Sequence, residues 1–176
     1  MKKIAKFFAY TLFFIFALIA FIPKASVYYL AEENLKKFDV VISKESLVES
    51  LFSLDVENLD ISAKGVESAY IKSVRFTFLG LYNGVTFKQI KLSSIVEAYL
   101  PSKIKLVNIE YSLLHPLSVE IGSLGEFGSL NARFDLVELK LNATLKPSKL
   151  MLKKYRSSLR FFKKSQEGEY VYAKAI

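Results

Sequence analysis

Apolar and polar residues alternate with a period of two through most of residues 54–145. The clearest runs are 74–78, 109–113 and 139–145, and turn sequences at 63–65, 82–84, Pro101 and Pro116 separate the strands. Successive side chains of a strand point to opposite faces of its sheet, so the pattern predicts antiparallel strands with one apolar face. A helix, a second sheet layer or a partner then has to cover that face.

Three hexapeptides in this region share an amide, an aliphatic residue, a charged or polar-face residue, an apolar residue and a serine. They are ENLDIS (57–62), KQIKLS (88–93) and VNIEYS (107–112), and VELKLN (137–142) is a partial fourth copy. Their starts lie 31 and then 19 residues apart, which excludes a solenoid of fixed period. Either one kind of strand recurs along a long curled sheet, or alternation by itself produces the similarity.

The N-terminus carries an apolar run from Phe7 to Ile22 that has no charge and only two hydroxyl groups, on Tyr10 and Thr11. A membrane-spanning helix needs about 20 apolar residues, and this run reaches that length when counted from Ile4. Residues 1–24 are therefore expected to form a short cytoplasmic segment and a transmembrane anchor. The residues expected in the membrane are Phe7, Phe8, Leu12, Phe13, Phe14, Phe16, Leu18, Phe21 and Ile22.

A cleaved signal peptide is the alternative for this segment. Cleavage after Ala20 would place Leu18 at the −3 position, and cleavage after Ala25 would place Pro23 there. Signal cleavage requires small residues at such positions, so an uncleaved anchor is favoured.

Three lysines, at positions 2, 3 and 6, precede the apolar run. Cytoplasmic flanks of membrane helices are rich in such residues, so the N-terminus is expected in the cytoplasm and the rest of the chain across the membrane. Tyr28 and Tyr29 are then expected at the far membrane interface, where amphipathic rings are favoured.

Residues 25–53 are expected to connect the anchor to the sheet. The segment 26–38 has the pattern of an amphipathic helix, and 39–43 that of a short strand. Ser43 resembles an N-cap, which predicts a brief second helix that ends near Phe52.

The net charge of +8 lies at the two ends of the chain. Residues 1–37 carry +4, residues 38–146 carry −2, and residues 147–176 carry +6. Because the central part is nearly neutral, the overall basicity does not indicate nucleic-acid binding, and no nucleic-acid partner is expected.

The rest of the chain, 54–176, is expected to form the β-rich domain, with a basic amphipathic helix over 148–164. The apolar stripe of this helix is Met151, Tyr155, Leu159 and Phe162, and the basic stripe is Lys149, Lys153, Arg156, Arg160 and Lys163. Three roles remain open for the basic stripe: a solvated face above a docked apolar stripe, contact with lipid headgroups, or contact with an acidic partner.

Catalytic and metal-binding patterns are absent from the sequence. With no cysteine and one histidine, a metal site would have to consist of carboxylates, and no clustered carboxylate loop occurs. His115 precedes Pro116, which indicates a turn and not a catalytic base. No metal, no catalytic residue and no enzymatic activity are therefore expected.

Gly122, Gly125 and Gly128 follow one another at intervals of three residues. Loops that bind phosphate lead into a helix N-terminus, whereas a strand pattern follows Gly128. The three glycines are therefore expected to bend the sheet, and no cofactor is expected.

The chain resembles the general secretion pathway protein N family, which is similar in architecture to AsmA-like and lipopolysaccharide-transport proteins of the periplasm. The resemblance rests on the anchor that ends in IPK, on a proline-led motif and on EGEYVY (167–172). The residues of the motif are Pro116, Leu117, Val119, Ile121, Gly125, Gly128 and Leu130.

This resemblance implies a single-pass protein of the bacterial inner membrane with a folded-over antiparallel sheet in the periplasm, similar to a β-taco or a jelly roll. It implies a non-enzymatic scaffold or accessory component of a type II secretion-like machine, with other envelope or secretion proteins as partners. The alternative is a lipid-binding or lipid-transfer module that holds acyl chains in an apolar β-groove, with membrane lipids as ligands.

Overall fold

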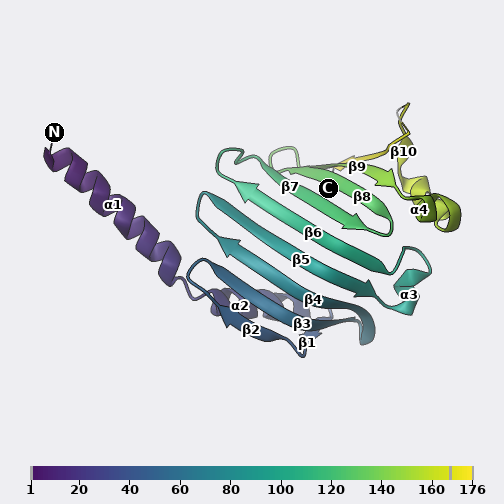
Figure 1. Cartoon of the computed structure of the whole chain (residues 1–176), viewed down its shortest axis with the longest axis horizontal. Coiled ribbons are helices and arrows are strands. Elements are labelled where there is room, and N and C mark those ends of the chain that lie inside the picture. The colour runs from purple at the N-terminus through teal and green to yellow at the C-terminus, as the bar shows by residue number, and fades with distance from the viewer. Residues whose placement is uncertain (1, 167, 176) are drawn as a thin grey trace.

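The computed structural model describes residues 2–166 and 168–175, in which eleven strands form one open antiparallel sheet (Figure 1). The strands are β1 (Val40–Ser43), β2 (Ser46–Glu49), β3 (Ser53–Ala63), β4 (Val66–Phe78), β5 (Tyr82–Leu92), β6 (Lys103–Ser112), β7 (Ser118–Gly125), β8 (Gly128–Asp135), β9 (Lys140–Pro147), β10 (Lys163–Lys164) and β11 (Tyr170–Ala175). The helices are α1 (Lys2–Phe21), α2 (Lys24–Lys36), α3 (Ser94–Glu97), α4 (Lys149–Lys154) and a 3-10 helix (Arg156–Phe161). The predicted mainly β fold is confirmed.

The sheet is a meander from β3 to β9, because each strand pairs with the next one along the chain. Lys64 and Gly65 connect β3 to β4 and both have positive φ, as a two-residue hairpin turn requires. The turn predicted at 82–84 is wrong: these residues begin β5, and the chain turns at 79–81, where Gly80 has a φ of 76°. The strands follow one open path, so the jelly-roll form of the expectation is not seen.

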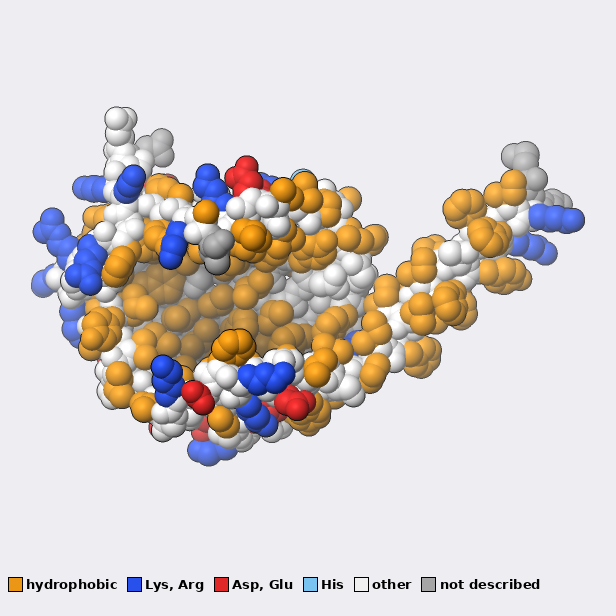
Figure 2. Space-filling model, turned by 180° about the vertical axis from the view of Figure 1, so that it is seen from behind, with side chains coloured by type: hydrophobic (Ala, Val, Ile, Leu, Met, Phe, Trp, Pro, Cys, Tyr) orange, Lys and Arg blue, Asp and Glu red, His pale blue; other side chains and the backbone are white. Residues whose placement is uncertain are grey.

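One face of the sheet is apolar and hollow (Figure 2). Two rows of directly paired residues cross this face from strand to strand. The first row is Phe76, Val85, Ile109, Ile121, Ala132, Ala143 and Tyr172, and the second is Val74, Phe87, Val107, Ser123, Leu130, Leu145 and Tyr170. We call the concave surface that these rows form the apolar hollow. Alternation along each strand produces it, since every second side chain points to the same face.

The two sides of the hollow are covered, and its middle is open. Tyr28 of α2 packs on a cluster from β3 and β4 that includes Leu54 and Val56. At the other side, Met151 and Leu159 pack on Leu145 of β9. Between the two clusters the row residues of β5, β6 and β7 are only partly buried, except for Ser123, which is buried. A short helix at each side therefore covers part of the apolar face and leaves the centre accessible.

Two residues of the hexapeptide pattern mark a crease in the sheet. Asn58 in β3 and Gln89 in β5 are the amides of the first two copies, and their φ angles are 60° and 53°. At each site two consecutive side chains, Glu57 with Asn58 and Lys88 with Gln89, are exposed, while apolar residues on both sides of them face the core. The residue with positive φ thus shifts the alternation of apolar and polar side chains by one position. Beyond it, apolar side chains again point to the same face.

The connector differs from its prediction at one element. The helix expected over 26–38 is α2, and the strand expected over 39–43 is β1. The brief helix from Ser43 to Phe52 is wrong, because residues 46–49 form β2 and pair with β3. Leu47 pairs with Val56 and packs on the first cluster, so burial against β3 overrides a local helical pattern.

The tail does not form the amphipathic helix predicted over 148–164. The Ser148 side chain accepts a hydrogen bond from the Met151 N–H, so the expected start is correct, but α4 ends at Lys154. Tyr155, with φ −119° and ψ 29°, breaks the helix before the 3-10 turn. Met151, Tyr155 and Leu159 are all buried, and this close docking on the sheet favours two short turns over one straight helix.

Tyr28 was expected at the membrane interface, but it lies in the core, 7 % exposed. Its Oη atom is buried, has no hydrogen-bond partner among the described residues, and burial raises the pKa of the phenol. Because a buried hydroxyl without a partner is costly, Tyr28→Phe is expected to raise the free energy of unfolding by about 1 kcal/mol. Urea unfolding in detergent checks this, with Tyr29→Phe, at an exposed position, as the neutral control. A destabilised Tyr28→Phe protein would contradict it.

Candidate functional site

The described residues leave the centre of the apolar hollow uncovered (Figure 2). Its two rows contain no charged residue, and Ala132 and Ala143 occupy adjacent positions on β8 and β9. Both alanines are buried. A cavity of about 240 Å³ adjoins the second cluster, between Leu130, Met151 and Phe162. Such a surface suits apolar chains, since polar groups in a ligand would find few partners there.

The opposite, convex face has a second concavity next to the crease, of about 750 Å³. Four lysines line it, Lys72, Lys91, Lys103 and Lys105, and Lys103 lies 3.9 Å from a carboxylate oxygen of Glu126. Their charges make this outer lysine pocket attractive to anions. Ile104 lines both this pocket and the cavity beside the second cluster, so the two concavities meet at that side chain.

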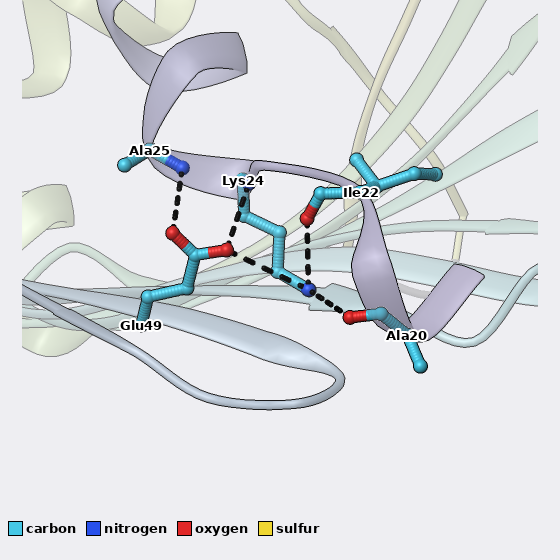
Figure 3. A network of polar contacts seen from close by, with 5 residues as sticks. All are labelled: Ala20, Ile22, Lys24, Ala25 and Glu49. Carbon is cyan, nitrogen blue, oxygen red and sulfur yellow. Dashed lines mark hydrogen bonds and ion pairs between the residues drawn. The ribbon is translucent and has the colours of Figure 1, made fainter. Parts of the chain in front are cut away.

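A polar network joins α1 to the sheet domain (Figure 3). Lys24 is 1 % exposed, and its ammonium group donates to the carbonyl oxygens of Ala20, at 3.2 Å, and Ile22, at 3.1 Å. Glu49 of β2 accepts from the backbone N–H groups of Lys24, at 3.0 Å, and Ala25, at 3.4 Å. We call these five residues the anchor joint.

The anchor joint caps two helices at once. The Lys24 ammonium satisfies carbonyls at the C-terminal end of α1, and the Glu49 carboxylate satisfies N–H groups at the N-terminal end of α2. Each charge lies at the helix end whose dipole favours it, and the two charges are 3.8 Å apart. The direction in which α1 leaves the domain is therefore held by side chains as well as by the backbone.

Sequence reasoning did not single out Lys24 or Glu49. Lys24 directly follows Ile22 and Pro23, where the apolar helix ends. A lysine near the C-terminus of a helix can bind the last carbonyl groups, so the sequence did contain a capping signal. The contact of Glu49 with α2 could not be predicted, because the segment that contains Glu49 was predicted to be a helix. Only the pairing of β2 with β3 brings this carboxylate to the start of α2.

Backbone hydrogen bonds from Lys24 and Ala25 lower the pKa of Glu49 below its ordinary value of 4.5. A carboxyl group whose pKa is lowered in the folded state stabilises the folded protein above pH 4.5. This stabilisation is lost as the pH falls through the pKa that the group has in the folded state. Glu49→Gln is therefore expected to lower the Tm at neutral pH and to differ least from the natural protein in acid. Thermal unfolding against pH checks this, with exposed Glu33→Gln of α2 as the control. An equal Tm difference at neutral and acid pH would contradict it.

All nine residues predicted to lie in the membrane are exposed in the structure. Eight belong to α1 and Ile22 follows it directly. The segment Lys3–Phe21 is long and apolar enough to cross a membrane, and 6 % of its most apolar window is buried. The helix thus projects from the sheet domain with its apolar surface uncovered (Figure 1).

The five predicted basic contacts do not form one stripe. All of them are exposed, but they belong to three elements: Lys149 and Lys153 to α4, Arg156 and Arg160 to the 3-10 helix, and Lys163 to β10. The apolar residues of the same segment dock on β9. The basic side chains thus lie on the outer surface of the docked segment.

The three glycines have different roles. Gly122 lies inside β7 and keeps a regular register with both neighbours, so it does not bend the sheet there, contrary to the prediction. Gly125 and Gly128 pair across the two-residue turn between β7 and β8, and Gly128 has a φ of 118°. His115 lies in the β6–β7 connection, where its N–H donates to the Ser112 carbonyl at 3.0 Å.

Comparison of the chain with protein-family models, with curated proteins and with solved structures finds no match.

Proposed function

We propose that this chain is a non-enzymatic, membrane-anchored module that holds acyl chains of lipids in the apolar hollow. The observation that carries the proposal is an uncharged concave face, open at its centre and carried by a domain whose first helix can cross a membrane (Figure 2). Water against so large an apolar surface is unfavourable, and hydrocarbon chains would cover it without needing polar partners.

The lysines that precede α1 favour an orientation with the N-terminus in the cytoplasm. We place the sheet domain on the other side, which in a bacterial inner membrane is the periplasm. The resemblance to the general secretion pathway protein N family remains a prediction, because it rests on the proline-led motif and the anchor.

The second candidate function is a scaffold of a secretion machine. It is favoured by the free edge of β11: within the described residues β10 pairs only with Tyr170 and Val171, so residues 172–175 offer unpaired backbone groups. A strand from a partner could extend the sheet at this edge.

Mass spectrometry of the full chain extracted in mild detergent tests the lipid function. We expect phospholipid to remain bound after the wash that removes it from an unrelated single-pass protein with a similar anchor. Consistent absence of lipid would refute the lipid function and leave the scaffold as the surviving candidate.

A further inference from the structure

Four chain connections lie at one end of the sheet, because alternate turns of a meander come together. They are the β2–β3 connection (50–52), the β4–β5 connection (79–81), the β6–β7 connection (113–117) and the β8–β9 connection (136–139). In Figure 1 this is the end from which α1 leaves the domain. The strand ends that these segments join also form one end of the apolar hollow.

Each of the four connections carries exposed large apolar side chains. They are Leu51, Leu79, Leu81, Leu113, Leu114, Leu117, Leu136, Val137 and Leu139. We call this set the leucine rim. Leu114 is 85 % exposed and Val137 67 %. Glu138 is the one charged residue in the four segments, whereas the connections at the opposite end contain Lys64, Glu97 and Glu126.

Helix α1 touches two of the connections that carry the rim. The rings of Phe16 and Phe52 meet edge to face with centroids 5.2 Å apart. The Ile19 side chain lies over Gly80, so close that a Cβ there would be 2.6 Å from its Cδ1. The C-terminal part of α1 therefore packs against two of the four connections.

Because α1 packs against these connections, we propose that the leucine rim inserts into the lipid bilayer that α1 crosses, in the leaflet where α1 ends. Exposed leucines on adjacent loops are unfavourable in water and favourable among acyl chains. The near absence of charge in the rim removes the main cost of insertion. One end of the apolar hollow then rests on the membrane. The proposal depends on the membrane anchorage of the proposed function, but it does not depend on lipid in the hollow.

The chain contains no tryptophan, so a single introduced indole reports its own surroundings. The full-length variants Leu114→Trp and Val137→Trp are reconstituted in vesicles of phosphatidylethanolamine and phosphatidylglycerol with brominated acyl chains. Ile95→Trp is the matched control, because Ile95 is 61 % exposed and lies in α3 at the opposite end of the domain. Circular dichroism establishes that all three variants keep the β fold.

We expect bromine to quench the two rim variants at least about twofold more strongly than Ile95→Trp, since indoles at a membrane interface lie near the acyl chains. Quenching of both rim variants no stronger than that of the control would overturn the proposal, and so would easy access of iodide to both. Lipid is measured by mass spectrometry in the same preparations. Strong rim quenching without bound lipid would refute the lipid function alone, and bound lipid without rim quenching would refute the docking alone.

Discussion

Replacing Gly128 by alanine is expected to lower the free energy of unfolding by about 3 kcal/mol or more. Gly128 opens β8 with a φ of 118°, a backbone conformation that residues with a side chain rarely adopt. A Cβ there would overlap the carbonyl oxygen of Lys146 and lie 2.8 Å from the backbone nitrogen of Ser148. Both atoms belong to the backbone of the adjacent β9 and the start of α4, so neither can move aside without disturbing the sheet.

Gly122→Ala is the matched control, because it makes the same chemical change six residues earlier in the same hairpin. A Cβ at Gly122 would meet only the Asn131 side-chain oxygen, at 4.0 Å. Alanine is better than glycine inside a strand, so this variant is expected to be neutral or stabilised by up to about 0.5 kcal/mol. Urea unfolding followed by circular dichroism checks both. Equal stability of the two variants would show that the hairpin is not built as described.

Ile121→Glu is expected to reduce the phospholipid retained per protein by about tenfold or more, because a charged side chain among acyl chains costs about 2.5–3.5 kcal/mol. Ile121 lies in the first row of the apolar hollow, between Ile109 on β6 and Ala132 on β8. It is only partly buried, so the carboxylate can stay hydrated when the hollow is empty. The substitution therefore acts on the ligand more than on the fold.

Leu124→Glu is the control for this prediction. Leu124 belongs to the same strand, is exposed, and lines the outer lysine pocket on the convex face. The same charge is added there without entering the hollow, so retained lipid is expected to be unchanged. Mass spectrometry on washed detergent extracts measures both variants. Equal lipid loss in the two would place the lipid outside the hollow, and no loss in either would contradict the assignment of the hollow as the binding site.

The anchor joint determines how the hollow and the leucine rim are oriented relative to α1. Lys24 and Glu49 hold the end of α1 against the domain, and Phe16 and Ile19 contact the β2–β3 and β4–β5 connections, which carry part of the leucine rim. In the proposed function the hollow is thereby kept at a constant position relative to the bilayer. A flexible linker at Pro23 would not do this, because the domain could then turn away from the membrane.

Much of the fold follows from local sequence patterns. The alternation over 74–78 and 139–145 predicts strands where β4 and β9 lie, and the apolar run before Pro23 predicts a helix long enough to span a membrane. These predictions succeed because side-chain periodicity and helix length depend on residues close together in the chain.

The errors occur where distant residues decide the structure. Residues 46–49 form a strand because β3 pairs with them, and the tail breaks at Tyr155 because its apolar residues dock on β9. Gly122 and Gly128 look equivalent in the sequence, yet only Gly128 has a neighbouring backbone where a side chain would go.

The sequence by itself determined that this chain has an apolar N-terminal helix and a sheet with one apolar face, because both depend on local periodicity. Tertiary structure alone decided which residues meet. Pairing across eleven strands brings the two apolar rows into one hollow, places Glu49 at Lys24, and gathers leucines from four separate connections into one rim. The physical reason is that strand register and the folding of alternate turns to one end are set by contacts between segments far apart in the chain.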